Sequence, residues 1–301
     1  MTAPAPAPVI WSYWEDLPGR RRGDYLGLCI ESLQRHAGGL ELRLLGHDDA
    51  RRWLPDLDKG VWESLPAPNF RSDYVRSRVL HRFGGIWADP DTIALRPLST
   101  LLDEVDETGT LCWGREFGRF FGGLCAAAPG SPFMESWAQA QDEAIGRASN
   151  GRGLEYAALA QGVTWSLARR LPWKSLPSDQ VAPVPWHEWR RFLSRVESPK
   201  RVLRSDPVTV VLWNMVMQRR LAKQTRAQLL RTHALIGRLF RIALGISSPE
   251  QEEDLLTRLA FVPSLRYSTT VQSIEKRGRT RARSMMAQRQ GAEGPSARQV
   301  S

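Results

Sequence analysis

The sequence predicts an α/β fold in which a mostly parallel sheet is flanked by helices. Short apolar runs typical of buried strands alternate with longer segments whose apolar residues recur at helical spacing. Glycine pairs that can end helices follow two of these segments, at Gly38-Gly39 and Gly84-Gly85. The 301 residues suffice for one large domain, or two small ones, with a substantial core.

The first elements follow one another in β-α-β-α order. A strand over Val9–Trp11 precedes a helix over Tyr25–His36, and a strand over Leu40–Leu45 precedes a short helix from His47 to Leu54. This order predicts parallel pairing of the strands. His47, Asp48 and Asp49 could form a metal cluster, but a strand-end histidine followed by helix-capping aspartate is the interpretation we favour.

A helix is predicted from Ser72 onward, ending at Gly84-Gly85. Its apolar stripe consists of Val75, Val79 and Phe83, and either Asn69 or Ser72 can cap its first turn. Asp73 and Arg76 lie three residues apart and therefore share one face of the helix. This pair either points into a cleft or is a solvated ion pair on a surface helix.

A short buried strand, Ile86–Ala88, leads directly into Asp89-Pro90-Asp91. Pro90 fixes its own φ and pushes Asp89 toward an extended conformation, so the run is a rigid turn at a strand end. Open α/β sheets bind their ligands at such ends. Two carboxylates one residue apart, with no cation nearby in sequence, suit a hard divalent metal shared with a diphosphate. Ordinary turn chemistry is the alternative.

The alternation continues to residue 214. Ser131 as a cap and Pro132 in the first turn support a helix over Ser131–Ile145. The other expected elements are strands at Thr92–Leu98, Thr110–Trp113, within Phe117–Ala128 and at Val208–Asn214, a helix at Tyr156–Leu167, and an extended segment at Val181–Trp189.

The central motif resembles that of a known family, the DxD-containing retaining glycosyltransferases of the GT-A fold, which include family 32-like and capsular polysaccharide enzymes. The matching residues are Ser72-Asp73, Arg76, Leu80, Gly84-Gly85-Ile86-Trp87 and Asp89-Pro90-Asp91. The resemblance implies a GT-A type, Rossmann-like sheet. It also implies transfer of a sugar, with retention, from a UDP- or GDP-sugar to a saccharide or lipid-linked glycan, assisted by Mn²⁺ or Mg²⁺.

The resemblance assigns roles to individual residues. Asp89, Asp91 and Arg76 form the implied catalytic set, in which Asp91 and Asp89 hold the metal. The implied contacts with the nucleotide sugar come from Trp14 as the base platform and from Asp73, Arg76, Trp87 and Asp89. Trp11 is the expected core residue, although both Trp11 and Trp14 could be core. Relatives often carry histidine where this chain has Val211, so Asn214 or His187 supplies a third metal ligand, or Asp91, diphosphate and water suffice.

The segment from Met215 to Leu244 is predicted to be helical and basic. Its apolar members could rest on an anionic membrane, or the helix could pack on the domain with its arginines facing water. The basic residues are Arg219, Arg220, Lys223, Arg226, Arg231, Arg238 and Arg241, and the apolar ones are Leu235, Ile236, Leu239, Phe240, Ile242 and Leu244. After Pro249 we expect an acidic patch, a short helix to Phe261 and a disordered polar tail.

The expected organisation is a disordered leader (1–8), a GT-A-like catalytic domain (9–216), a helical basic extension (217–267) and a disordered basic tail (268–301). The net charge of +10 indicates an anionic partner. Cys29, Cys112 and Cys125 lack the spacing of a zinc site or redox pair, which favours a reducing cytoplasm. Neither a signal peptide nor a membrane span is evident, so we expect a cytoplasmic protein, peripheral on the inner face of a membrane and serving surface polysaccharide synthesis.

Two other functions are compatible with parts of the sequence. A phosphatase of the haloacid-dehalogenase type also places DxD at a strand end. In those enzymes, however, the apolar strand before the motif is longer than the strand here, which Gly84-Gly85 shortens. A membrane- or nucleic-acid-binding protein on a degenerate transferase scaffold would explain the basic tail and Val211. No interleaving of aromatic and basic residues is typical of a nucleic-acid module here, so we do not expect nucleic acid as a partner.

Overall fold

The computed structural model describes residues 7–17, 22–114, 120–149, 153–155 and 158–246. All of them belong to one compact unit, Met1–Leu256. The predictions for the leader up to residue 6, for the acidic patch and short helix after Pro249, and for the tail over 268–301 lie outside the described residues.

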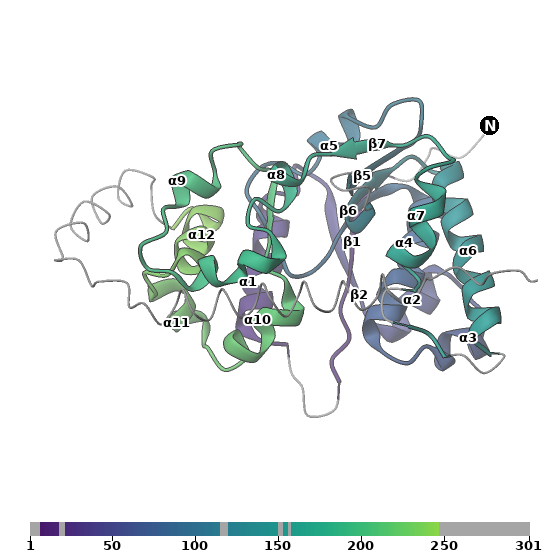
Figure 1. Ribbon diagram of the computed structural model, residues 1–301, viewed down its shortest axis with the longest axis horizontal. Helices are drawn as coiled ribbons and strands as arrows, with labels where there is room; N and C mark the ends of the chain where they lie inside the picture. Colours follow the sequence, from purple (N-terminus) through teal and green to yellow (C-terminus); the bar gives the residue numbers. More distant parts are fainter. Residues whose placement is uncertain (1–6, 18–21, 115–119, 150–152, 156–157, 247–301) are drawn as a thin grey trace, which may run out of the picture. The chain divides into compact units, whose positions relative to one another are not determined.

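The predicted fold class, a mostly parallel sheet flanked by helices, is confirmed (Figure 1). Among the described residues, six strands form the main sheet in the order β2-β1-β3-β6-β5-β7. Strand β1 runs parallel to β2 and β3, β5 runs parallel to β7, and β6 is antiparallel to β3 and β5. The bounds are β1 Val9–Tyr13, β2 Glu41–Leu45, β3 Gly85–Ala88, β5 Thr110–Gly114, β6 Phe120–Ala127 and β7 Lys174–Leu176.

A second, two-stranded sheet pairs β4 (Thr92–Ala94) with β8 (Thr209–Val211) in antiparallel register, with Thr92 opposite Val211. The predicted strand Thr92–Leu98 is therefore shorter than expected. The pairing has a consequence for the site, because it brings the end of β8 next to the Asp89-Pro90-Asp91 turn, which directly precedes β4.

The main sheet is buried on both faces. Side chains alternate along a strand, so Trp11 and Trp87 enter one core cluster while Ile10 and Ile86 enter another. Helices α4 and α6 cover the first face, and α1 lies on the opposite side (Figure 1). The helices are α1 Asp24–Arg35, α2 His47–Trp53, α3 Lys59–Ser64, α4 Pro68–Phe83, α5 Thr100–Asp103, α6 Pro132–Ser149, α7 Gln161–Leu167, α8 Ser178–Val181 and α9 Pro199–Val202.

The caps of two predicted helices differ from the structure, and the helix predicted over Tyr156–Leu167 begins only at Gln161. Helix α4 begins at Pro68 with Ala67 as its N-cap, so neither Asn69 nor Ser72 is the cap. Proline suits the first helical position because its φ is already helical and its missing N–H is not needed there. Helix α2 is capped by Gly46, whose N–H donates to the Asp49 carboxylate at 3.2 Å. The predicted cap Ser131 accepts from the Met134 N–H at 3.2 Å and is confirmed.

The segment predicted to be extended over Val181–Trp189 is partly helical. Helix α8 ends at Val181, and after Pro183 and Pro185 a 3₁₀ helix, η2, runs from Trp186 to Leu193. The residues between them, 182–185, belong to neither a helix nor a strand.

The segment from Met215 onward forms three helices rather than one: α10 Asn214–Leu221, α11 Arg226–Arg231 and α12 Leu235–Leu244. Thr225 and Gln228 form a reciprocal capping box that starts α11 afresh. Most of the apolar residues that we expected at a membrane, among them Leu239 and Phe240, are fully buried against α1. The amphipathic pattern therefore reflects packing on the domain. No helix in the described part of the chain has the length and apolar character needed to cross a membrane.

Candidate active site

The motif residues meet where β3 ends. The Asp89 N–H donates to the Gly123 carbonyl of β6 at 2.8 Å, and the Thr92 N–H donates back to the Asp89 carbonyl at 3.1 Å. These bonds fix the Asp89-Pro90-Asp91 turn between β3 and β4. Both aspartates are partly exposed, whereas Pro90 between them is buried.

Arg76 of α4 ties the helix to the turn. Its Nη2 lies 2.8 Å from Asp89 Oδ1 and 3.3 Å from Asp73 Oδ1, although the arginine is only 4 % exposed. The shared helix face of Asp73 and Arg76 therefore points into the site. Asp89 of the turn therefore has a cation as its partner, supplied from thirteen residues earlier along the chain.

Trp87 is fully buried, so it offers no surface to a nucleotide. Its indole N–H instead donates to Asp89 Oδ1 at 2.8 Å, and its ring faces the Arg76 guanidinium at 5.0 Å. Asp89 Oδ1 thus accepts from two donors. Its second oxygen, Oδ2, lies over Gly123 and is the one left for a ligand.

Asp91 is held from the other side by the end of β8. The Asn214 N–H donates to Asp91 Oδ2 at 2.7 Å, and the side-chain carbonyl of Asn214 accepts from the hydroxyl of Tyr25 on α1. Trp213 aims this N–H by adopting φ 58°, a left-handed conformation that bulky residues rarely take. Strain of this kind at a site residue is typical of functional positions.

Two glycines of β6 make room for these groups. A Cβ on Gly123 would come within 2.9 Å of Asp89 Oδ2, and a Cβ on Gly122 would collide with the Arg76 guanidinium. A glycine inside a strand is a recognisable signal for such close approach. The sequence patterns assigned no functional role to this pair or to Tyr25.

The site carries more negative than positive charge. Burial, and next the charge of Asp89, raise the pKa of Asp91 to about 6, against a lowering effect of the Asn214 N–H. Burial likewise raises the pKa of Asp73 to about 6, opposed by Arg76. Burial lowers the pKa of Arg76, but Asp89 and Asp73 outweigh it and raise that pKa overall. Three carboxylates facing one guanidinium leave an excess that a cation would neutralise.

The remaining residues that the sequence singled out are Trp14, Trp11, His187 and Val211. Trp14 follows β1, is half-buried next to the cluster that contains Tyr25, and donates its N–H to Asp16 at 2.8 Å. Trp11 is core, as expected. His187 is exposed on η2, and Val211 is buried within β8. Among the described residues, no three or more His, Cys, Asp or Glu side chains gather as a metal site, the group His47-Asp48-Asp49 included.

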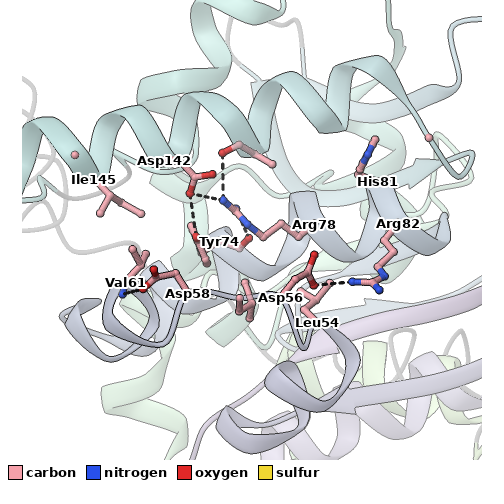
Figure 2. Close-up of a pocket in the computed structure, with 14 residues that line it drawn as sticks. Leu54, Asp56, Asp58, Val61, Tyr74, Arg78, His81, Arg82, Asp142 and Ile145 are labelled. Carbon is pink, nitrogen blue, oxygen red and sulfur yellow. Dashed lines mark hydrogen bonds and ion pairs between the residues drawn. The ribbon is translucent and has the colours of Figure 1, made fainter.

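A separate pocket of about 850 Å³ lies between α4, α6 and residues 54–61 (Figure 2). None of the motif residues lines it. Both of its arginines are paired with carboxylates, Arg78 with Asp142 at 2.5 Å and Arg82 with Asp56 at 2.6 Å. An ionic ligand would have to displace these partners, so this pocket is a weaker candidate for diphosphate chemistry than the motif.

A mixed α/β sheet with a DxD turn at a strand end, braced by a helix-borne arginine, defines a nucleotide-sugar transferase type of site. Residues 27–108 match the model of a family described as the glycosyltransferase sugar-binding region containing a DXD motif. This stretch includes Asp73, Arg76, Asp89 and Asp91. This match confirms the predicted resemblance to the DxD-containing glycosyltransferases, and the chain is identified as a glycosyltransferase. The phosphatase and the non-enzymatic scaffold are thereby set aside.

Among known proteins, the chain is 26 % identical over 212 residues to lactosylceramide 4-alpha-galactosyltransferase of Pongo pygmaeus. The matched region covers 65 % of this chain and 90 % of the relative. Two solved structures are more distant in sequence, each 14 % identical. The glycosyltransferase GlyE of Streptococcus pneumoniae has a TM-score of 0.45, with 79 % of this chain and 61 % of GlyE covered. The galactosyltransferase LgtC, solved with donor and acceptor sugar analogs, has a TM-score of 0.40, with 81 % of this chain and 99 % of LgtC covered.

We expect Gly123→Ala to lower the rate of sugar transfer by about 10²-fold while the protein stays folded, because the new methyl group displaces Asp89 Oδ2 and a misplacement near 1 Å has that scale of effect. The measurement is turnover together with the melting temperature. Gly27→Ala is the matched control, since a Cβ at Gly27 in α1 meets nothing within 4 Å. Full activity of Gly123→Ala would contradict a direct role of Asp89 Oδ2.

Proposed function

We propose that this glycosyltransferase moves a hexose from a UDP- or GDP-sugar to a saccharide or lipid-linked glycan, with a divalent metal bound at the Asp89-Pro90-Asp91 turn. One observation carries the proposal: each carboxylate has one oxygen engaged by the protein, Asp89 Oδ1 by Arg76 and Trp87 and Asp91 Oδ2 by Asn214, which leaves its other oxygen for a ligand.

The donor set fits Mn²⁺ or Mg²⁺. Both are hard cations that take carboxylate oxygens and keep waters or phosphate oxygens in their remaining positions. The charge of Asp89, which adds to burial in raising the pKa of Asp91, favours a dication in the same place. When bound, the metal would stabilise the negative charge of the leaving diphosphate.

Asn214 is better suited to positioning Asp91 than to binding the metal. Its N–H already holds Asp91, and its side-chain carbonyl already accepts from Tyr25. We therefore assign the metal to Asp91 and Asp89, completed by diphosphate and water. This assignment needs no histidine at the position of Val211.

Arg76 acts through its two carboxylates in this proposal. It is almost fully buried and its Nη2 is shared by Asp89 and Asp73, so its main part is to hold both for their ligands. Asp73 then offers its carboxylate to ribose or sugar hydroxyls. The proposed transfer retains the anomeric configuration by a same-face path without a covalent nucleophile.

The test is a release assay with purified protein, Mn²⁺ or Mg²⁺, and a panel of UDP- and GDP-sugars, in which free nucleotide is scored. The name of the mammalian relative makes UDP-galactose the first donor and lactose the first acceptor to include. Nucleotide release that requires the metal supports the proposal. Failure of every donor, or equal release in EDTA, overturns it.

Trp14→Ala is expected to raise the donor KM by about tenfold with little change in kcat, because stacking on the base is equally strong in the ground and transition states. Stacking of a base on an aromatic ring has the magnitude required for this change. Nucleotide titration and the melting temperature are measured together. Unchanged affinity with a lower melting temperature would make Trp14 a core residue.

The proposal places the enzyme in the cytoplasm, peripheral on the inner face of a membrane that carries the acceptor for surface polysaccharide synthesis. Its support is now charge alone, from exposed residues such as Arg219, Arg220 and Lys223. We expect co-sedimentation with anionic vesicles that decreases as salt is added. Equal partitioning to neutral and anionic vesicles would contradict it.

A further inference from the structure

We propose that Trp186 is the platform on which a sugar ring of the acceptor stacks. The inference rests on the proposed function and adds a residue to the acceptor side of the site. It starts from the exposure of Trp186, whose large apolar side chain is 59 % exposed at the first position of η2.

Trp186 lies on a segment that is hydrogen-bonded to the residues following β8. The Val184 carbonyl accepts from the Trp213 indole N–H at 2.8 Å, and the next residue, Asn214, donates to Asp91 at 2.7 Å. Trp186 is two residues beyond Val184, a step of at most about 7 Å along the chain. The segment that carries Trp186 and the Asp91 carboxylate are therefore both held by the two residues Trp213 and Asn214.

The segment that carries Trp186 is firmly fixed. Prolines at 183 and 185 restrict its backbone. Val184, which precedes Trp186 in the sequence, and Phe192, which follows it, are both buried. The end of η2 is anchored by the Leu235 N–H, which donates to the Ser194 carbonyl at 2.8 Å. A rigidly held and solvent-exposed tryptophan loses little conformational freedom when it binds a ligand.

The neighbouring tryptophan shows why Trp186 is the available one. Trp189 is half-buried, and its ring has the guanidinium groups of Arg220 and Arg190 at 4.2 and 4.8 Å. The Trp186 ring has exposed His187 beside it, edge-on at 6.1 Å. A flat apolar ring bordered by a polar side chain suits a pyranose, whose C–H face is apolar and whose hydroxyls lie around its edge.

The first experiment separates donor from acceptor. With a donor that turns over and lactose as acceptor probe, we expect Trp186→Ala to raise the acceptor KM about tenfold, the change that a loss near 1.4 kcal/mol produces. The donor KM should stay within about twofold, and Trp186→Tyr should retain most of the acceptor affinity. Trp165→Ala is the matched control, because Trp165 on α7 is also exposed, at 44 %.

An unchanged acceptor KM in Trp186→Ala overturns the inference, and so does an increase in the donor KM alone, which would make Trp186 a base platform. The second experiment needs no turnover: saturation-transfer NMR of lactose and of methyl glycosides of galactose, glucose and mannose. We expect signal with the wild type and Trp165→Ala and its loss in Trp186→Ala. Equal signal with all proteins, or no signal with any of them, overturns the inference even where nucleotide release has succeeded. If nucleotide release fails but the signal depends on Trp186, only the donor proposal is overturned.

Discussion

Arg76→Met is expected to abolish sugar transfer and to lower the free energy of unfolding by about 3–5 kcal/mol at pH 7.5. Arg76 is 4 % exposed, and its Nη2 lies 2.8 Å from Asp89 Oδ1 and 3.3 Å from Asp73 Oδ1. Methionine fills a similar volume but leaves both carboxylates without their cation. Two effects follow, a misplaced Asp89 and buried negative charge without compensation.

Denaturant unfolding of the metal-free protein measures this loss. It should be smaller at pH 5 than at pH 7.5, because the pKa of Asp73 is already raised to about 6 and rises further without Arg76, so the carboxyl can take up a proton. Arg96→Met is the control: the Arg96–Asp206 pair is 2.8 Å long but largely exposed, and such pairs contribute less than about 1 kcal/mol. A stability loss for Arg76→Met no larger than that of Arg96→Met would contradict the bracing role.

The core of this site could be predicted because it is local in sequence. Asp73 and Arg76 are one turn apart on a helix, and the helix, the strand β3 and the turn follow within about twenty residues, a span in which periodicity and turn chemistry are informative. Their convergence follows from the β-α-β order, since a helix that precedes a strand packs on it.

The partners from distant segments could not be predicted in the same way. Asp91 is held by Asn214, 123 residues away, and Asn214 in turn by Tyr25, 189 residues away, and both contacts depend on the pairing of β4 with β8 and on the packing of α1. Nothing in a single sequence sets that register. The glycines at 122 and 123 gave a signal of close approach, but not the identity of the group that approaches.

Helix α12 shows a second limit of sequence patterns. An apolar stripe among arginines is typical both of a helix at a membrane surface and of one packed on a core. Here Leu235, Leu239 and Phe240 are fully or almost fully buried, and Arg238 is buried with them and donates to the Glu197 carbonyl. The periodicity correctly indicated an amphipathic helix, but what covers its apolar face is decided by α1 and η2.

Asp91→Asn is expected to lower sugar transfer by at least about 10³-fold and, at the same time, to stabilise the metal-free protein. The amide is nearly isosteric and can still accept from the Asn214 N–H, so the turn keeps its geometry. What is lost is the anionic oxygen proposed to hold the metal. The stability gain comes from removing an unfavourable negative charge. Burial and Asp89 raise the pKa of Asp91 from 3.8 to about 6, a shift that corresponds to between about 1 and 3 kcal/mol for a partly exposed group.

The pH dependence identifies the source of that gain. A carboxyl whose pKa is raised on folding contributes its full stability below pH 3.8, where both states are protonated, and loses it as the pH rises through about 6. Asp91→Asn should therefore melt several degrees above the wild type at pH 7.5 in EDTA, with the difference shrinking toward pH 4. Mn²⁺ should raise the melting temperature of the wild type but not of the variant. Asp103→Asn, an exposed substitution on α5, should change neither quantity. A variant that retains both activity and its response to Mn²⁺ would remove Asp91 from the metal site.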